Sequence, residues 1–484
     1  MVKGWCPGAL RPMESGDGLL VRLRISGGIV DIALAQQIAR WSRHWGNGQI
    51  DLSNRGNLQV RGLAVRHLPA LHEALAEYGL LDGSEAGEAV RNVISSPLAG
   101  LDPGAVLDVR PMAQSLEHRL VHDAALHALP GKFGFVLDDG GMLGLDEVPA
   151  DIRFIAVQTN DGPAFDIHLD GAAHDCLGPC HPAAVGDVAA ALSDVFLRHR
   201  AERGTLVRRM RDMVAAHGAE AIAGDATLAH AHSPRAARAA RPASFLGAHR
   251  LGSAGFLGVG LPFGRIMAED FAELASAAAA NGAPALHLTP WRAILAPVPS
   301  MLAAQTLSAG LTEDRFVLDP ADTRRRIAAC SGAPSCARGT TPARGDAVAL
   351  AAETARAVSD QVAPPSTRHG RASPGHPPPA AGAKMAGTTL PRVLGRPAIT
   401  NWCNVIGNSS NTTEGGVVLH VSGCEKGCAH PGAARVTLVG RDGRYDLVDD
   451  GVASDAPTLR NLTLAQAAEQ VRNRVADQSA GDAA

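Results

Sequence analysis

The sequence has no long apolar run, little net charge and few cysteines, and each shortage excludes a class of protein. No stretch is long enough and apolar enough for a membrane span. The 45 Lys and Arg residues against 48 Asp and Glu give a net charge of -3, which offers no basis for non-specific nucleic-acid binding. Eight cysteines in 484 residues are too few for a disulfide scaffold, and MVKGWCPGALRPM is unlike a secretory leader. We therefore expect a cytoplasmic protein with reduced thiols and with no membrane or nucleic-acid partner.

Four of the eight cysteines occur in two short segments. CSGAPSC places Cys330 and Cys336 six residues apart, and CEKGC places Cys424 and Cys428 four apart. Two loops that each deliver two thiolates can surround an iron–sulfur cluster or a tetrahedral metal without threading the chain through the site. Structural zinc is the alternative, but its cysteine pairs usually lie roughly two to four residues apart. The wider first pair therefore favours an iron–sulfur cluster.

A strand–helix–strand pattern occurs twice in the chain. Residues 18–63 alternate apolar and basic residues, continue through a segment with helical spacing, and return to alternation. Residues 255–296 repeat this pattern at an offset of 236, so that Gly28 aligns with Gly264. The repeat predicts two related halves with one site between them.

Continuing the offset aligns Ile94 with Cys330, so the first cysteine segment should have a cysteine-free counterpart in the other half. Beyond this point the second half needs about fifty extra residues to align GVVLHVSGCEKGC with LPGKFGFVLDDGG. Residues 359–416 account for them, because they are rich in Pro, Arg and Gly and hold no acidic residue between Asp360 and Glu414. We predict a solvated insertion there, with a basic docking arm as the alternative.

Together these motifs resemble the sulfite and nitrite reductase superfamily. The resemblance rests on the repeated half-units, SNRGNLQVRG, the RNV segment, LPGKF, and the C-x5-C and C-x3-C pairs. Within the superfamily, CPGALRPMESGDGLLVR, LPGKFGF and SGCEKGCAHPG are similar to the precorrin-3B synthase family. The resemblance covers nearly the whole chain apart from the insertion.

For the fold, the resemblance implies a duplicated α+β architecture around one cluster site. We expect two ferredoxin-like half-units, each followed by a larger reductase-like α+β domain, of which only the second holds the cluster. The expected bounds are 12–75 for the first half-unit, 85–235 for the first larger domain, 245–310 for the second half-unit, and 315–476 for the cluster domain, interrupted at 359–416.

For function, the resemblance implies an oxygen-dependent monooxygenase of aerobic cobalamin biosynthesis. Such an enzyme converts precorrin-3A and O2 to precorrin-3B by C20 hydroxylation and lactone formation. It would use a [4Fe-4S] cluster, a mononuclear non-haem iron and NADH-derived electrons. GVGLPFG at 258–264 lacks the third glycine of a dinucleotide-binding loop, so we expect an external electron donor protein. The resemblance assigns the cluster to Cys330, Cys336, Cys424 and Cys428.

The resemblance also marks residues of a substrate pocket, and the chemistry of a tetrapyrrole agrees with them. An early corrinoid precursor carries about eight carboxylates around a flat ring, which arginine can hold by paired hydrogen bonds. We predict catalytic roles for Arg91 and Lys132. The predicted substrate-binding residues are Arg22, Arg24, Arg55, Gln59, Arg61 and Asn92.

Departures from the reductases bear on the choice between functions. Gly134 stands where sulfite reductases place a second lysine, and Lys426 replaces an asparagine that is usual there. Because six-electron reduction of an oxyanion needs several cationic proton donors, we favour the monooxygenase. The alternative is a sirohaem-dependent nitrite or sulfite reductase, in which Cys428 would bridge the cluster and the haem iron. An electron carrier without a substrate pocket is a third possibility.

Two further groups of metal-binding residue types remain open. The segment HDCLGPCH at 174–181 contains Cys176 and Cys180, which we interpret as incidental thiols of a surface loop, with a second metal site as the alternative. His420 and His430 flank the second cysteine pair. Either could hold the second iron or be a hydrogen-bonded core histidine.

Overall fold

The computed structural model describes residues 7–172, 176–204, 207–228, 244–362 and 417–481. Most of the predicted insertion, 363–416, lies outside the described residues. Its first four residues, 359–362, instead form the last turn of helix α10 (Ala343–Val362). Among the described residues, no helix combines the length and the apolar character needed to cross a membrane.

Two five-stranded sheets with the same plan are formed by the repeated units. The first has the order β1-β2-β5-β4-β13 and the second the order β11-β12-β15-β14-β3. The strands are β1 (Met13–Ser15), β2 (Gly18–Leu23), β3 (Ile29–Asp31), β4 (Gln49–Leu52), β5 (Leu58–Leu63), β11 (Gly247–Leu251), β12 (Ala254–Gly260), β13 (Arg265–Met267), β14 (Ala285–Leu288) and β15 (Ala293–Val298).

The two repeated units exchange a strand. β13 follows β12 in sequence but pairs with β4 of the first unit, while β3 pairs with β14 of the second. The predicted offset of 236 is kept by this exchange, since β3 begins at Ile29 and β13 at Arg265. Gly28 and Gly264, which precede the exchanged strands, both have positive φ, at +69° and +72°. The two units are therefore interlocked and share one apolar core.

Each unit also contributes one helix to the packing between the sheets. Helices α1 (Ile32–Trp45) and α8 (Ala268–Ala280) pack against each other. In α1 the side chain of Asp31 caps the first turn by accepting a hydrogen bond of 2.8 Å from the amide of Leu34. The buried face of α1 repeats at helical spacing and enters the shared core.

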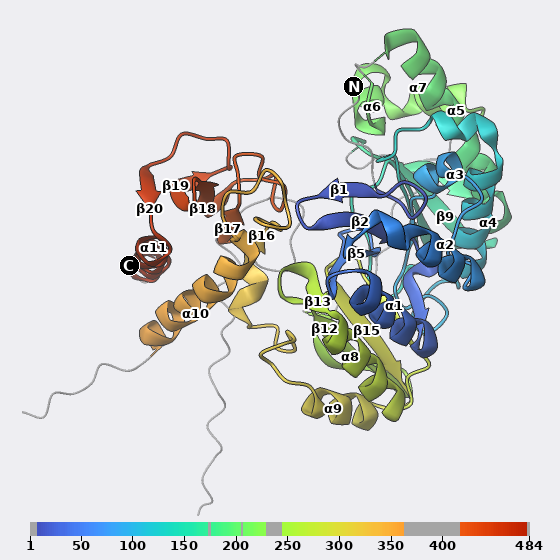
Figure 1. The fold of residues 1–484 in the computed structure, drawn as a ribbon. Helices are drawn as coiled ribbons and strands as arrows, with labels where there is room; N and C mark the ends of the chain where they lie inside the picture. The colour runs from blue at the N-terminus through green and yellow to red at the C-terminus, as the bar shows by residue number, and fades with distance from the viewer. Residues whose placement is uncertain (1–6, 173–175, 205–206, 229–243, 363–416, 482–484) are drawn as a thin grey trace, which may run out of the picture.

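Two further sheets carry the larger domains, and they again share one plan. Their strand orders are β6-β7-β8-β9-β10 and β16-β17-β18-β19-β20, with the first two pairings parallel in each. Figure 1 shows the second of these domains on one side of the interlocked units and the first on the other. The strands are β6 (Val93–Ser95), β7 (Phe135–Asp138), β8 (Ile152–Thr159), β9 (Gly162–Leu169), β10 (Cys176–Cys180), β16 (Ile327–Ala329), β17 (Leu419–Ser422), β18 (Ala434–Arg441), β19 (Arg444–Gly451) and β20 (Leu459–Leu462).

Helices cover one face of each of these sheets. In the first domain α4 and α5 pack over an aromatic core, and in the second α10 packs against α11. The remaining helices are α2 (Leu68–Glu77), α3 (Glu85–Val90), α4 (Arg110–His122), α5 (Val185–Arg203), α6 (Met210–His217), α7 (Ala219–Asp225), α9 (Met301–Gly310) and α11 (Leu464–Gly481).

The pairing of these strands corrects part of the predicted alignment between the two halves. Val93 lies opposite Phe135, as Ile327 lies opposite Leu419. Counting from these pairs, the residue equivalent to Cys330 is the one that follows β6, which is Ser96, and the alignment of Ile94 with Cys330 was wrong by two residues. Leu58 and Ile294 are equivalent, because each lies opposite the last residue of the preceding strand. Val93 follows Leu58 by 35 residues, whereas Ile327 follows Ile294 by 33, so the second half is two residues shorter between these points.

Candidate functional site

The four cysteines of the predicted cluster are brought to one edge of the second domain. β16 runs directly into Cys330, and β17 is followed after one residue by Cys424. Because these strands are parallel neighbours, their carboxyl ends meet at the same edge and their loops face each other. The amide of Gly423 donates a hydrogen bond of 3.1 Å to Sγ of Cys330, which joins the two loops directly.

Glycines permit this close approach of the loops. Gly332 has φ +63°, and a Cβ placed on it would lie 2.4 Å from the backbone nitrogen of Ala343. A Cβ on Gly423 would lie 3.0 Å from the Cα of Gly332 across the gap. Side chains at these two positions would therefore push the cysteine loops apart.

The four cysteines fit a cubane better than a single metal ion. Burial raises the pKa of the Cys428 thiol, Lys426 lowers it, and the charges of the other three cysteines raise it further, so the four sulfurs share one neighbourhood. Yet among the described residues no three of these Sγ atoms lie within 4.8 Å of one another. A tetrahedral zinc ion would hold its sulfurs about 3.8 Å apart, whereas a cubane binds one cysteine at each of four irons and sets them wider.

Two histidines lie beside the second cysteine loop. His420 is fully buried on β17, and its ring meets that of His430 edge to face with centroids 5.8 Å apart. Burial, and next the charge of His430, lower the pKa of His420 to about 4. Neither ring nitrogen of His420 has a hydrogen-bond partner among the described residues. His420 is therefore not the hydrogen-bonded core histidine of the sequence-based alternative, and as a neutral imidazole it can ligate a metal.

The equivalent edge of the first domain is closed without cysteine. Oγ of Ser96 accepts a hydrogen bond of 2.9 Å from the amide of Asp139, which reproduces the contact between Cys330 and Gly423. The Asp139 carboxylate in turn accepts from the amide of Gly141 at 2.8 Å, and burial raises its pKa to about 6. In the first larger domain, hydrogen bonds between carboxylates and backbone amides therefore hold the loop that is equivalent to the second cysteine loop.

A basic pocket is formed where the first half-unit meets the first larger domain. Four of the predicted residues line it, and they come from four separate segments: the end of β2, the turn between β4 and β5, the end of α3 and the start of β6. Gly134, the position without the second lysine, also lines the pocket. The four predicted residues are Arg24, Arg55, Arg91 and Asn92.

The guanidinium groups of this pocket are fixed by neighbouring acceptors. Arg91 pairs with Asp82 at 2.9 Å and with Glu117 at 3.7 Å. Although burial lowers the pKa of Arg91, the neighbouring carboxylates, Asp82 above all, together raise it above its usual value, so Arg91 stays charged. Arg24 donates to the side-chain oxygen of Asn92, and Arg55 donates to the carbonyl of Lys132 at 2.9 Å. The pocket therefore presents cations on a rigid wall.

Three predicted residues lie elsewhere or differ from expectation. Arg22 and Gln59 face each other across β2 and β5, and the Gln59 amide oxygen, in the orientation that satisfies both groups, accepts from Arg22 at 2.8 Å. Lys132, which was predicted to be catalytic, is exposed in the turn before β7 and does not line the basic pocket. The glycine-rich turn around it delays the strand until Phe135.

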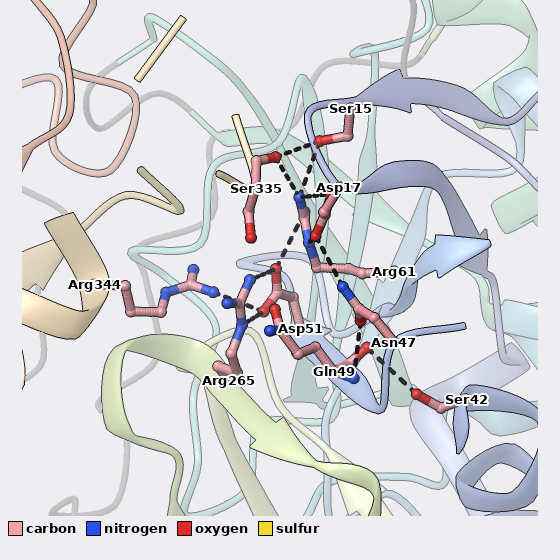
Figure 2. Close-up of polar contacts among 10 residues, drawn as sticks. All are labelled: Ser15, Asp17, Ser42, Asn47, Gln49, Asp51, Arg61, Arg265, Ser335 and Arg344. Carbon is pink, nitrogen blue, oxygen red and sulfur yellow. Dashed lines mark hydrogen bonds and ion pairs between the residues drawn. The ribbon is translucent and has the colours of Figure 1, made fainter. Parts of the chain in front are cut away.

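Arg61 is placed in a buried ion-pair network and not on the wall of the basic pocket (Figure 2). Its side chain is 3% exposed and pairs with Asp17 at 2.9 Å and Asp51 at 3.4 Å. Nη2 also donates to the carbonyl of Ser335 at 2.7 Å, inside the first cysteine loop. These contacts make Arg61 a support for that loop.

Asp51 joins three parts of the chain in the same network (Figure 2). It accepts from Arg265 on β13 and from Arg344 on α10, each at 2.7 Å, in addition to Arg61. Burial raises the pKa of Asp51, but its three arginine partners together outweigh burial and bring the value to about 2. Burial lowers the pKa of Arg344 to about 10. Sequence patterns could not predict this group, because it depends on the strand exchange.

The thiols of HDCLGPCH are not in a surface loop as predicted. Cys176 and Cys180 are the ends of β10, at the edge of the first larger sheet, and Cys180 is buried. His181 caps the following turn by accepting from the amide of Ala183 at 3.2 Å. His174 lies outside the described residues. Among the described residues of this segment, Cys176, Cys180 and His181 therefore do not gather as one group.

Comparison with protein families identifies both domain types of the first half. A model described as the nitrite/sulfite reductase ferredoxin-like half domain matches residues 11–78, and one described as the nitrite and sulphite reductase 4Fe-4S domain matches residues 86–227. The second match covers the domain whose edge carries Ser96, so it identifies the domain type and not the cysteine positions. An iron–sulfur cluster is a property of this type of domain.

Similarity to characterised proteins extends over most of the chain. A precorrin-3B synthase of Sinorhizobium sp is 31% identical over 465 residues, which cover 95% of this chain and 85% of that protein. A ferredoxin–nitrite reductase of Synechococcus elongatus is 27% identical over 70% of each chain. The structure of the Mycobacterium tuberculosis NirA protein aligns with a TM-score of 0.67 at 19% identity, over 94% of this chain and 79% of that one. The predicted duplicated α+β fold is thus confirmed. The chain belongs to the precorrin-3B synthase family within the nitrite and sulfite reductase superfamily, whose members are oxidoreductase-type enzymes.

Proposed function

We propose that the protein converts precorrin-3A to precorrin-3B with O2, by hydroxylation at C20 and closure of a lactone. The observation that carries the proposal is the position of Gly134 on the wall of the basic pocket. In a sulfite reductase this position would hold a lysine that donates protons to a small oxyanion. Here the pocket keeps the cations that hold carboxylates and lacks that proton donor.

The arginines of the pocket would bind the substrate through its carboxylates. Arg24, Arg55 and Arg91 each have neighbours that fix the side chain, so little side-chain freedom is lost on binding. A guanidinium forms paired hydrogen bonds with a carboxylate, which sets the orientation of a flat macrocycle as well as its affinity. We assign Arg91 on the pocket wall, and Lys132 in the turn that Arg55 contacts, to the reacting side of the ring. The other pocket residues, Arg24, Arg55 and Asn92, are assigned to binding.

Cys330, Cys336, Cys424 and Cys428 would hold the [4Fe-4S] cluster, which when bound supplies one-electron transfer. The protein's own part is to keep the two loops closed through the amide of Gly423 and the contact of Arg61 with the first loop. We propose that electrons derived from NADH reach the cluster through an external donor protein, of ferredoxin type by analogy with the named reductases.

The mononuclear iron implied by the family needs neutral nitrogen or carboxylate ligands. His420 fits this requirement, because it is buried, has a pKa of about 4, and leaves both ring nitrogens without partners among the described residues. We propose it as the histidine that would face such an iron.

Turnover with isotopic oxygen tests the proposed reaction. Anaerobically purified protein is mixed with precorrin-3A, a chemical reductant and 18O2, and the product is analysed by mass spectrometry. We expect a product heavier by one oxygen atom that carries the label. Unchanged precorrin-3A in the presence of an intact cluster would reject the proposal.

The alternative is a sirohaem-dependent nitrite or sulfite reductase, which the 27% identity to a ferredoxin–nitrite reductase supports. The two candidate enzymes differ in their visible absorption spectra. A sirohaem enzyme has intense Soret and red absorption bands, whereas the proposed synthase shows only the broad absorption of its cluster. A Soret band in the purified protein would favour the reductase.

A further inference from the structure

Three metal-binding side chains meet at the far edge of the first larger sheet. Asp166 and His168 lie on β9, and Cys176 begins the neighbouring edge strand β10. One ligand atom from each of the three lies within 4.8 Å of the other two. Among the described residues this is the one group of three such side chains so closely placed.

A β-bulge creates this arrangement. Cys176 pairs with His168, but after a register shift Cys180 pairs with Phe165. Because residues of one strand alternate between faces, His168 and Phe165 point to opposite sides of the sheet. The bulge therefore turns Cys180 into the aromatic core and Cys176 toward Asp166 and His168. Without the extra residue both thiols would lie on the same face.

The surroundings of the three side chains suit a bound cation. Asp166 is 3% exposed, and the amide of Gly178 donates to Sγ of Cys176 at 3.3 Å, which orients the thiol. The neighbouring cation on the same face, Arg153, lies opposite His168 and donates to the carbonyl of Leu145 at 2.9 Å. Burial and the charge of Asp166 raise the pKa of Cys176, with the Gly178 amide acting against them. A metal ion would reverse this and favour the thiolate.

We propose that Asp166, His168 and Cys176 bind one divalent transition-metal ion that ties the edge strand β10 to β9. Carboxylate, imidazole and thiolate together select a late first-row ion such as Fe2+ or Zn2+ over Mg2+ or Ca2+, which prefer oxygen alone. The three ligand atoms lie no more than 4.8 Å from one another, so reaching tetrahedral spacing requires movements of about 1 Å at most, within the reach of side-chain rotation. Three protein ligands leave one position for water.

This site is separate from the basic pocket and does not rest on the proposed function. His168 on β9 and Ile94 on β6, which lines the pocket, are joined across the sheet through Arg153 and Val136. Three strand spacings put the two roughly 14 Å apart. The role of the ion is therefore structural, in holding an edge strand that is paired on one side.

Metal and sulfide analysis tests the site. The holoprotein is purified anaerobically, dialysed against a small excess of Zn2+, and assayed for iron, zinc and acid-labile sulfide per chain. We expect one ion in excess of the cluster iron and of the mononuclear iron proposed beside His420. Cys176→Ser and His168→Ala should each lose that ion and keep the sulfide content of the wild type, and both should melt at a lower temperature.

Cys180→Ala is the matched control, because it removes a thiol from the same strand on the opposite face, and it should keep the extra ion. If Cys176→Ser fails to fold, Asp166→Asn gives the same comparison through a different ligand. Wild-type protein that takes up no ion beyond the cluster and the mononuclear iron, or variants that bind as much metal as the wild type, would overturn the inference. A negative turnover assay with precorrin-3A would leave this result unchanged.

Discussion

Ser96 and Cys330 occupy the same position in the two halves, and each side chain accepts a hydrogen bond from a backbone amide of the neighbouring loop, at 2.9 Å from Asp139 and 3.1 Å from Gly423. The fold of this edge is therefore compatible with either oxygen or sulfur. The duplicated architecture can keep one metal-bearing edge and one metal-free edge with the same backbone plan.

We expect Cys330→Ser to remove the cluster while the fold persists. Serine can accept a hydrogen bond from the amide of Gly423, as Ser96 does from the amide of Asp139. Its hydroxyl is, however, a poor ligand for the iron of a cubane. The variant should lose the cluster absorbance and most labile sulfide and keep its far-ultraviolet circular dichroism. A variant with full sulfide content would show that Cys330 is not a ligand.

Gly332→Ala should prevent closure of the cysteine loops. The added Cβ would lie 2.4 Å from the nitrogen of Ala343, and φ of +63° is strained for alanine. We expect a loss of roughly 2 kcal/mol or more in unfolding free energy and a lower cluster content. Gly345→Ala is the control, because nothing lies within 4 Å of its Cβ position and α10 favours alanine. Equal cluster content in the two variants would contradict the role given to Gly332.

The Asp51 network should make stability depend on pH in the acid range. The pKa of Asp51 is lowered from 3.8 to about 2 in the folded protein, so its carboxylate stabilises the fold fully above about pH 4. This contribution, roughly 2 kcal/mol, is lost as the pH falls toward 2.

Asp51→Asn leaves Arg265 and Arg344 buried without their carboxylate and should cost about 3–5 kcal/mol near neutral pH. The difference from wild type in urea unfolding should shrink as the pH falls below 4. Asp187→Asn, whose side chain is 81% exposed, should change stability by about 0.5 kcal/mol at most. A difference for Asp51→Asn that is constant with pH would show that its charge is not responsible.

Arg55→Ala should weaken substrate binding. Arg55 lines the pocket and is held by the carbonyl of Lys132, so its removal deletes one preset carboxylate contact. A charge-assisted hydrogen bond contributes about 1.5–3 kcal/mol, which corresponds to a rise in KM for precorrin-3A of roughly tenfold or more. Arg40→Ala on the exposed face of α1 is the charge-matched control. The proposed binding role fails if both variants have the KM of the wild type.

The sequence predicted the repeat and the four cysteines because both depend on local patterns: the offset of 236 survives in β3 and β13, and the cysteines follow two strands. The strand exchange could not be predicted, since strands of three residues carry no signal for their partner. Arg61 illustrates the consequence. Its charge suggested a substrate contact, but its acceptors Asp51 and the Ser335 carbonyl come from segments that only the long-range pairing brings together.

Gly134 distinguishes the proposed synthase from a reductase, and its environment allows a direct test. A Cβ at this position would lie 3.5 Å from the carbonyl of Asn92, which is an ordinary contact, so Gly134→Ala should fold and keep activity within about twofold. Gly134→Lys would add a cation to a pocket that already holds Arg24, Arg55 and Arg91. The ammonium would occupy the space of the macrocycle, and we expect loss of precorrin-3A turnover with the cluster intact, measured by product formation and labile sulfide. Gly134→Lys that retains turnover would place the reacting ring away from this wall and would remove the observation on which the proposed function depends.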